Sequence, residues 1–134
     1  MKVVLCHGVF DLLHLGHVEH LRQAKAMCGV RGKLFVSVVA DDFLHESKRP
    51  TIYDENERME MLKALRYVDQ VVLCKAPGPE GIIGRLRPTL YVRGNEYDGR
   101  EMPESALLRE LGVKVRYTKS LPTHTRDILQ RLSA

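Results

Sequence analysis

Two histidines flanking a glycine stand where a short apolar segment gives way to a helix. His14 and His17 are three residues apart, with Gly16 between them, so on a helical entry both imidazoles project to one side. The preceding residues 2–6 are largely apolar and too few for an independent helix, which predicts a buried strand. A strand that feeds a helix through a glycine bend presents backbone N–H groups where an anion binds readily. This stretch therefore predicts a phosphate site.

Two better-known phosphate loops do not match this stretch. Gly8 and Gly16 lie eight residues apart, so the glycine spacing of the dinucleotide-binding fingerprint is missing. No Gly-Lys-Ser or Gly-Lys-Thr follows, which excludes a P-loop. His20 continues the three-residue spacing and would allow a zinc site, but no fourth ligand or cysteine pair stands nearby. Phosphate is the favoured ligand, and a purely structural role for the histidines is the remaining alternative.

Composition and charge set broad limits on the class of protein. The chain has 134 residues, 44% hydrophobic and 28% charged, as in ordinary globular domains. Its net charge of +4 could suit nucleic acid, but aromatic residues make up 6% and the basic residues are scattered, which disfavours a base-stacking surface. No apolar run approaches the roughly 20 residues of a membrane span. We expect a cytoplasmic protein that binds neither nucleic acid nor membrane.

The cysteines indicate a reducing environment. There are three of them, an odd number, and Cys6 and Cys74 fall in predicted strands. Small buried thiols are therefore expected for these two and for Cys28, rather than disulfides.

Strand and helix patterns alternate five times along the sequence. Short apolar runs predict strands, and longer segments with apolar residues on one face predict helices. The expected strands are 2–6, 33–40, 70–74, 89–93 and 113–118, and the expected helices are 16–28, 55–66, 80–86, 103–111 and 123–132. This order predicts an α/β, Rossmann-like single domain over residues 1–134, with a five-stranded parallel sheet and helices on both faces.

Ligands of such sheets bind outside the carboxyl ends of the strands, at the topological switch point. The segments expected at this edge are 7–17, 41–48, Lys75, 94–97 and 119–126. Within them, His7 is expected in the first loop. Asp41 and Asp42 are expected to cap a local turn, with a contact to ribose or metal as the alternative. His20 is expected on the surface of the first helix or against a partner.

The segment from Gly8 to His17, Gly-Val-Phe-Asp-Leu-Leu-His-Leu-Gly-His, resembles the signature of the cytidylyltransferase-like nucleotidyltransferases. Three further regions resemble the middle and the fourth strand of these enzymes, namely 48–58, 64–72 and 86–97. The resemblance covers nearly the whole chain. It implies a nucleotidyltransferase domain over residues 1–134 that forms a homodimer.

The resemblance also implies a reaction. An NTP and a phosphorylated polyol or sugar, such as glycerol 3-phosphate, would give a nucleotide-linked product and pyrophosphate. The attacking group would be a phosphate monoester, whose second pKa is about 6. Because it is largely dianionic at pH 7, it needs no strong general base. The site would then hold two anions in line and neutralise the charge that develops between them.

Roles for individual residues follow from the same resemblance. His14 and His17 would contact the triphosphate and stabilise the transition state, with Lys48 reaching in from the loop after the second strand. Asp11 would orient the first loop or help to hold Mg²⁺, the expected cofactor, and Lys75 would face the acceptor phosphate. The residues expected to bind the nucleotide are Gly8, Val9, Phe10, Asp11, Gly16, Arg58, Gly94, Asn95, Tyr97, Lys119, Thr123, Thr125 and Arg126. For Arg58, an exposed helix charge or an ion-pair partner is the alternative.

The chain departs from the family pattern near its end. Relatives carry a Ser/Thr-rich segment at the start of the last helix, whereas this chain has Lys119–Arg126, in which His124 interrupts the hydroxyl residues Thr123 and Thr125.

Three functions remain in competition. CTP is the favoured nucleotide, because the compact length resembles that of the glycerol-3-phosphate enzymes of the family. The alternative is an ATP-dependent adenylyltransferase of the heptose 1-phosphate type, which the 94–97 loop favours. The altered segment 119–126 would also suit a non-catalytic, nucleotide-binding regulatory module. A fragment related to aminoacyl-tRNA synthetases shares the two-histidine motif, but the chain is too short for one, and Ser47-Lys48 matches their second loop poorly.

Overall fold

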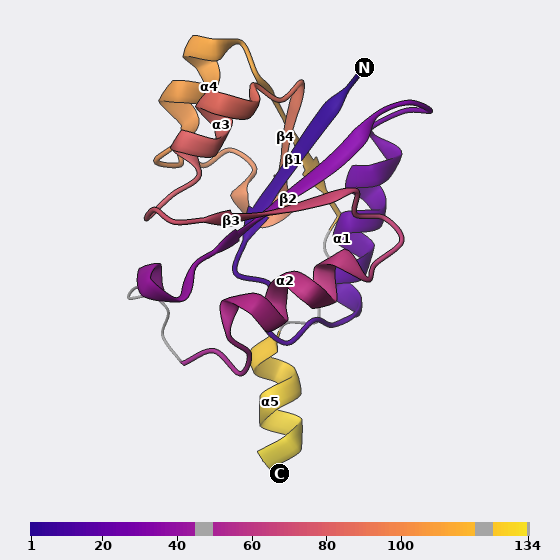
Figure 1. Ribbon diagram of the computed structural model, residues 1–134, viewed down its shortest axis with the longest axis vertical. Coiled ribbons are helices and arrows are strands. Elements are labelled where there is room, and N and C mark those ends of the chain that lie inside the picture. The colour runs from indigo at the N-terminus through magenta and orange to yellow at the C-terminus, as the bar shows by residue number, and fades with distance from the viewer. Residues whose placement is uncertain (45–49, 120–124, 134) are drawn as a thin grey trace.

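Strands and helices alternate in the computed structural model (Figure 1), which describes residues 1–44, 50–119 and 125–133. The strands are β1 (Val3–Gly8), β2 (Lys33–Val39), β3 (Gln70–Cys74), β4 (Leu90–Gly94) and β5 (Lys114–Thr118). The helices are α1 (Leu15–Ala26), α2 (Glu55–Lys63), α3 (Glu80–Leu86), α4 (Ser105–Leu111) and α5 (Thr125–Ser133). Two short 3₁₀ turns, η1 (Asp41–Phe43) and η2 (Asn95–Tyr97), follow β2 and β4.

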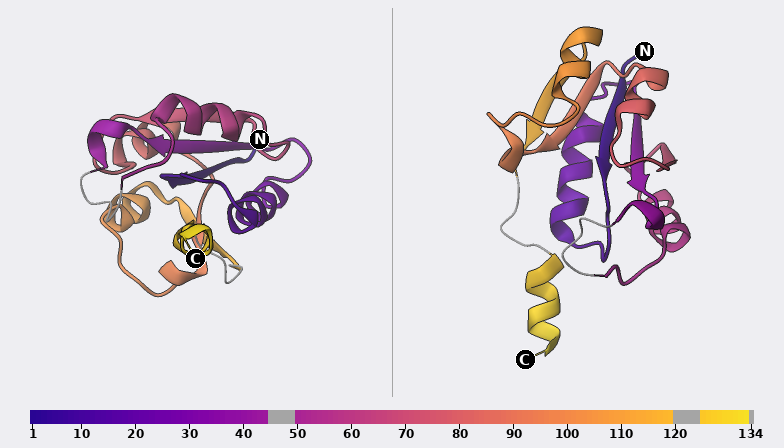
Figure 2. Two further views of the ribbon diagram at one scale, coloured as in Figure 1. Left: turned by 90° about the horizontal axis from the view of Figure 1, so that it is seen from below. Right: turned by 90° about the vertical axis from the view of Figure 1, so that its left-hand side faces the viewer.

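The sheet is parallel throughout, with strand order β3-β2-β1-β4-β5. Leu21 of α1 and Leu62 of α2 are buried in one core cluster. Ile83 of α3 and Leu108 of α4 are buried in a second cluster. The sheet therefore lies between helices, as both views of Figure 2 show, and α3 and α4 stand beside each other in Figure 1. The predicted α/β fold, with a five-stranded parallel sheet and helices on both faces, is confirmed.

Some elements differ from the prediction in their extent or type. β1 continues past Cys6 because its ladder with β2 runs on to the Gly8–Val38 pair. His7 consequently lies in a strand, and its predicted place in the first loop is wrong. The segment after β2, predicted as a loop, begins with the turn η1.

The direction of chain progression reverses between β1 and β4, which makes this the topological switch point of the sheet. These strands pair through Val4–Leu90 and Leu5–Tyr91, near their amino ends. The register of β1 with β2 is longer and runs the full length of β1. β1 and β4 therefore separate toward their carboxyl ends, at the place where such sheets bind ligands.

All three cysteines are buried and free, as predicted. Burial raises the pKa of the Cys6 thiol to about 12, so it stays protonated near neutral pH. In the described ranges, no helix is both long and apolar enough to cross a membrane.

Candidate active site

The loop between β1 and α1 has a constrained backbone. Phe10 and Leu12 have positive φ angles of 53° and 49°, a region that residues other than glycine adopt at a cost. The Phe10 ring folds back against the end of β1, where a Cβ added at Gly8 would lie 3.1 Å from it. Gly8 therefore permits a close approach that a larger residue would crowd. Such a loop needs support from the rest of the fold.

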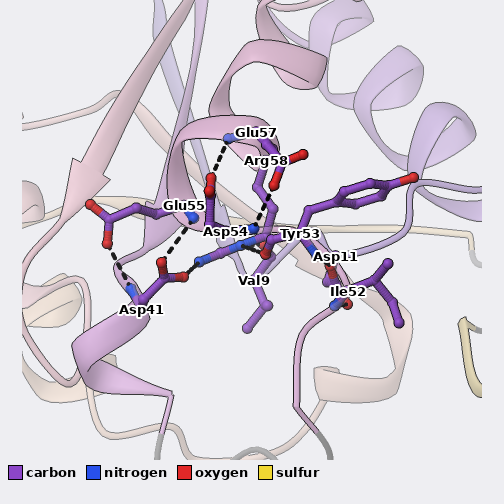
Figure 3. Close-up of polar contacts among 9 residues, drawn as sticks. All are labelled: Val9, Asp11, Asp41, Ile52, Tyr53, Asp54, Glu55, Glu57 and Arg58. Carbon is purple, nitrogen blue, oxygen red and sulfur yellow. Dashed lines mark hydrogen bonds and ion pairs between the residues drawn. The ribbon is translucent and has the colours of Figure 1, made fainter.

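Asp11 supplies part of this support (Figure 3). Its side chain is buried, and its two carboxylate oxygens accept hydrogen bonds from the backbone N–H groups of Ile52 and Tyr53, at 2.8 and 3.0 Å. This arrangement agrees with the predicted role in orienting the loop. It does not fit the predicted Mg²⁺ ligand, because both oxygens face backbone donors and the residue is only 4% exposed.

Arg58 holds the same loop from α2. Its side chain is fully buried. The guanidinium donates to the Val9 carbonyl at 2.9 Å, to the Tyr53 carbonyl at 3.2 Å and to Asp41 Oδ1 at 2.7 Å. The alternative of an exposed helix charge is wrong, and the ion-pair alternative is correct. With its three nitrogens donating to these protein oxygens, Arg58 supports the loop between β1 and α1 from the protein interior. Its predicted contact with the nucleotide stays a prediction.

Asp41 acts as the partner of this arginine and as a link to α2. Its Oδ2 accepts from the Glu55 N–H at 3.1 Å, while its own N–H donates to Glu55 Oε1 at 2.9 Å. Figure 3 shows both contacts. The carboxylate is therefore engaged in capping and ion pairing, as the sequence favoured, rather than placed for ribose or metal.

The two motif histidines form a reciprocal cap at the start of α1. His14 Nδ1 accepts from the Gly16 N–H at 3.0 Å, and His17 Nδ1 accepts from the His14 N–H at 3.3 Å. The ring centroids lie 4.0 Å apart. Because Nδ1 is an acceptor in both rings, the proton of each neutral imidazole resides on Nε2. In this tautomer each ring can donate through Nε2–H, and such a donor can stabilise negative charge on a phosphate.

Arg93 at the switch point is a residue to which the sequence reasoning gave no role. Its Nη1 donates to the His7 carbonyl at 3.2 Å and contacts the Tyr91 hydroxyl at 3.4 Å. Its guanidinium also lies 4.0 Å from the centre of the Tyr97 ring, a cation–π contact. Its position in the sequence could have indicated this role. Arg93 lies near the carboxyl end of β4, the strand beside β1, and this is the edge where such sheets bind ligands.

The predicted residues after β4 lie around this arginine. Gly94 ends the strand, and the exposed Asn95 and half-buried Tyr97 form the turn η2. Their predicted contact with the nucleotide stays a prediction. The structure brings them to the same edge of the sheet as the first loop.

Side chains of α1 also contact the chain at the end of β5. The ring of His20 is half-buried, with Nδ1 2.6 Å from Thr118 Oγ1. The predicted alternative of a contact with a partner stays a prediction. Burial and the nearby Arg93 charge lower the pKa of His20. The side-chain amide of Gln23 makes two hydrogen bonds with the backbone of Lys119. It donates to the carbonyl at 3.1 Å and accepts from the N–H at 2.9 Å. The exposed Lys119 is thereby fixed next to α1.

The remaining predicted residues fall into three groups. Lys75 is exposed directly after β3, on the far side of the sheet from β5. Lys48 and Thr123 lie outside the described residues, as do the side chains of Thr125 and Arg126 at the start of α5. Val9, Phe10 and Gly16 belong to the first loop and the helix start described above.

A cavity of about 510 Å³ opens beside the first loop, at the carboxyl ends of β1, β2 and β4. It is lined by His7, Val9, Val39, Phe43, Leu44, Pro77, Gly78, Pro79, Glu80, Arg93, Pro103 and Glu104. At its base, His7 Nδ1 lies 2.7 Å from Ser37 Oγ. Burial and the Arg93 charge lower the pKa of His7 to about 4, so this imidazole is neutral at pH 7.

A protein-bound metal ion needs an arrangement of several ligating side chains. Across residues 1–44, 50–119 and 125–133, no group of three or more His, Cys, Asp or Glu is arranged to hold a metal ion. The zinc alternative required His14, His17 and His20 together, but the third of these is engaged with Thr118.

A comparison with protein families matches residues 5–128 to the family described as "Cytidylyltransferase-like". The chain belongs to this family. The match covers the sheet and the candidate site, and it confirms the family that the Gly8–His17 segment resembles. The cytidylyltransferase-like fold found here is thus that of a nucleotidyltransferase.

Curated relatives of this cytidylyltransferase-like chain include two with names that describe an activity. The D-beta-D-heptose 1-phosphate adenylyltransferase of Bordetella bronchiseptica is 40% identical over 114 residues, covering 82% of this chain and 68% of that protein. The FAD synthase of Pyrococcus abyssi is 38% identical over 117 residues, covering 84% of this chain and 75% of that protein.

Other matches are to longer or structurally solved proteins. The bifunctional protein HldE of Streptomyces coelicolor is 38% identical over 82% of this chain, which spans 24% of that relative's length. The crystal structure of the lipopolysaccharide core biosynthesis protein from Thermoplasma volcanium has a TM-score of 0.72 and 28% identity, covering 92% of this chain and 99% of that one.

Replacing Arg58 tests the support of the first loop. Arg58→Met should lower the free energy of unfolding by about 3 kcal/mol, because two carbonyls and a carboxylate lose a buried cationic partner. Urea denaturation monitored by circular dichroism measures the change. Arg109→Met is the matched control, since Arg109 pairs with Glu101 at the exposed surface and such pairs contribute little. Equal, small effects of the two substitutions would contradict the role given to Arg58.

The buried His7 predicts a dependence of stability on pH. Its folded pKa of about 4 lies below the ordinary 6.5, so between these values the unfolded chain binds more protons. The stability is therefore full above pH 6.5 and falls as the pH decreases toward 4. At pH 5 this group should cost on the order of 2 kcal/mol. Urea denaturation at pH 7 and pH 5 should show a smaller loss for His7→Asn, and an unchanged loss would refute the assignment.

Proposed function

We propose that this chain transfers an adenylyl group from ATP to the phosphate of a phosphorylated sugar or polyol. A phosphate oxygen of the acceptor attacks the α-phosphorus of ATP. The bond from the α-phosphorus to the oxygen that bridges it to the β-phosphate breaks, and pyrophosphate leaves with that electron pair. The product is a sugar or polyol joined to AMP through a diphosphate.

The observation that carries this proposal is the pair of Nε2–H donors at the start of α1. Both imidazoles are oriented by backbone hydrogen bonds at Nδ1, so neither has to reorganise as charge develops. Fixed donors aimed at a developing charge are among the largest contributions to catalysis. The helix start adds its own preference for an anion.

The same arrangement supports a reaction without a general base. A phosphate monoester has a second pKa of about 6 and is already a competent nucleophile at pH 7. The protein's task in this proposal is to hold the acceptor and the α-phosphate in line and to offset their charge. Histidines that donate through Nε2 suit that task better than proton removal.

ATP is proposed as the donor because of the relatives. One is named an adenylyltransferase and another an FAD synthase, whose product contains an adenylyl group. The CTP preference drawn from chain length has less support among these named proteins. Mg²⁺ accompanies the triphosphate as its counter-ion in this proposal, with no protein ligand assigned. The proposal also includes Lys48 and the hydroxyl groups of Thr123 and Thr125, which would contact the phosphates of the nucleotide. It further includes a homodimer.

A matrix of nucleotides and acceptors tests the proposed reaction. The four NTPs, each with Mg²⁺, are combined with glycerol 3-phosphate, hexose and heptose 1-phosphates and flavin mononucleotide, and pyrophosphate release is measured. We expect the highest kcat/KM with ATP and a sugar phosphate. Highest turnover with CTP would reject the adenylyl assignment while retaining the transferase. Nucleotide binding without turnover of any pair would instead favour the regulatory module.

Substitution of His17 tests the donor role separately from the helix cap. Glutamine at this third helical position can still accept from the N-cap backbone, as in a capping box, but it lacks the imidazole Nε2–H. We expect His17→Gln to retain the fold by circular dichroism and to lower kcat by about 10²–10³-fold. Glu19→Gln, on the surface of the same helix, is the control and should leave kcat unchanged. A His17→Gln enzyme with near-normal kcat would overturn the role.

A further inference from the structure

The cavity beside the first loop contains a buried acidic residue that the proposed mechanism does not use. Glu104 directly precedes α4, is 4% exposed and lines the cavity. Its Oε2 accepts a 2.6 Å hydrogen bond from the Tyr91 hydroxyl. Burial, countered in part by the Arg93 charge, raises the pKa of Tyr91, so this hydroxyl remains a donor and fixes the carboxylate in place.

The Glu104 carboxylate has unused capacity to accept hydrogen bonds. An ionised carboxylate offers about four acceptor positions. Within the described part of the chain, the Tyr91 hydroxyl is the one side-chain group that donates to it. No buried side-chain oxygen in the described residues lacks a partner, and Glu104 lines the cavity, so its remaining acceptor positions are open to donors that enter from the cavity. Hydroxyl groups of a ligand are such donors.

Charges of both signs line the cavity, and a cation and a carboxylate contact the same hydroxyl group. Arg93 contacts the Tyr91 hydroxyl and the His7 carbonyl, and Glu104 accepts from that hydroxyl. Although burial opposes its charge, Tyr91, Tyr97 and Glu104 hold the pKa of Arg93 above its ordinary value. Glu80 lines the cavity as well. A ligand with one phosphate is therefore attracted to the arginine by that group, and its uncharged hydroxyls can donate to the neighbouring Glu104.

The cavity dimensions suit a ligand of this kind. A volume of about 510 Å³ accommodates a sugar phosphate, and Val39, Phe43 and Leu44 supply apolar surface for its carbon skeleton. A second phosphate would add negative charge to a cavity that already contains Glu80 and Glu104, and it would be repelled by them. A flavin ring system would present fewer O–H donors to the same carboxylate.

We propose that this cavity binds the acceptor of the reaction and that Glu104, oriented by Tyr91, determines its specificity by accepting hydrogen bonds from acceptor hydroxyls. The expected substrate class is a polyhydroxylated monophosphate, in preference to flavin mononucleotide or a bisphosphate. This inference rests on the proposed function, because it assigns the second substrate of that reaction.

Steady-state kinetics of Glu104→Gln with ATP and the best sugar monophosphate test the inference. A hydrogen bond to a charged group contributes about 1.5–3 kcal/mol, so KM for the acceptor should rise by roughly 10–100-fold. KM for ATP and kcat should change little, which a general loss of structure would not produce. Glu101→Gln, an exposed residue outside the cavity, is the matched control and should retain the wild-type constants. An unchanged acceptor KM in Glu104→Gln overturns the proposal.

Monodeoxy analogues of that acceptor identify the hydroxyl concerned. One analogue should lose affinity for the wild-type protein by the same factor and show no further loss with Glu104→Gln, since both changes remove one contact. Additive losses for every analogue would contradict the contact. If Glu104→Gln does not fold, Tyr91→Phe replaces it and should raise the acceptor KM in the same direction. No rise in that variant would count against the proposal.

Failure of this inference can be told apart from failure of the proposed function. Turnover of flavin mononucleotide in preference to every sugar phosphate would overturn the specificity assignment and leave the transferase intact. If no pair is turned over, the proposed function fails, and calorimetric titration of glucose 1-phosphate, mannose 1-phosphate and glycerol 3-phosphate decides the cavity assignment. Binding weakened by Glu104→Gln would support the cavity assignment. Absent or unchanged binding would overturn it.

Discussion

The candidate site depends on one buried guanidinium. Arg58 joins the backbone of the first loop, the segment before α2 and the turn after β2, through Val9, Tyr53 and Asp41. A cation without exposure is tolerated because each of its three nitrogens donates to a protein oxygen, one of them a carboxylate. The loop it supports contains two residues in the left-handed region. The geometry of this loop is therefore held from the protein interior.

A second constraint arises where β1 and β4 separate. The backbone ladder between them ends near Leu5 and Tyr91, and the Arg93 side chain bridges the gap by donating to the His7 carbonyl. Its guanidinium stacks on Tyr97 on one side and reaches Tyr91 on the other. The loop predicted to meet the nucleotide and the cavity proposed for the acceptor thus share one cation. This position would let it respond to charge on either substrate.

Periodicity predicted the fold well, because continuous apolar strands and one-sided helices leave few arrangements for five alternating units. The two-histidine motif and the family followed from residues 8–17. The contacts of Arg58 did not follow, since the resemblance predicted a contact with phosphate, and Val9 and Asp41 are brought to this arginine only by the fold. His20 and Thr118 are likewise 98 residues apart in sequence. Contacts of this range leave no local pattern, so supporting residues escape prediction more readily than the motif they support.

The hydrogen bonds that begin α1 also determine which nitrogen of each motif histidine carries the proton. A cap formed by Ser or Asp would satisfy the same backbone N–H groups, but it would leave no donor pointing away from the helix. Imidazole has a second nitrogen, so one ring can accept from the backbone through Nδ1 and donate through Nε2. Helix formation and charge stabilisation therefore use opposite edges of the same side chains. A glutamine can replace histidine in the first task but not in the second, which is why folding and activity should be separable at His17.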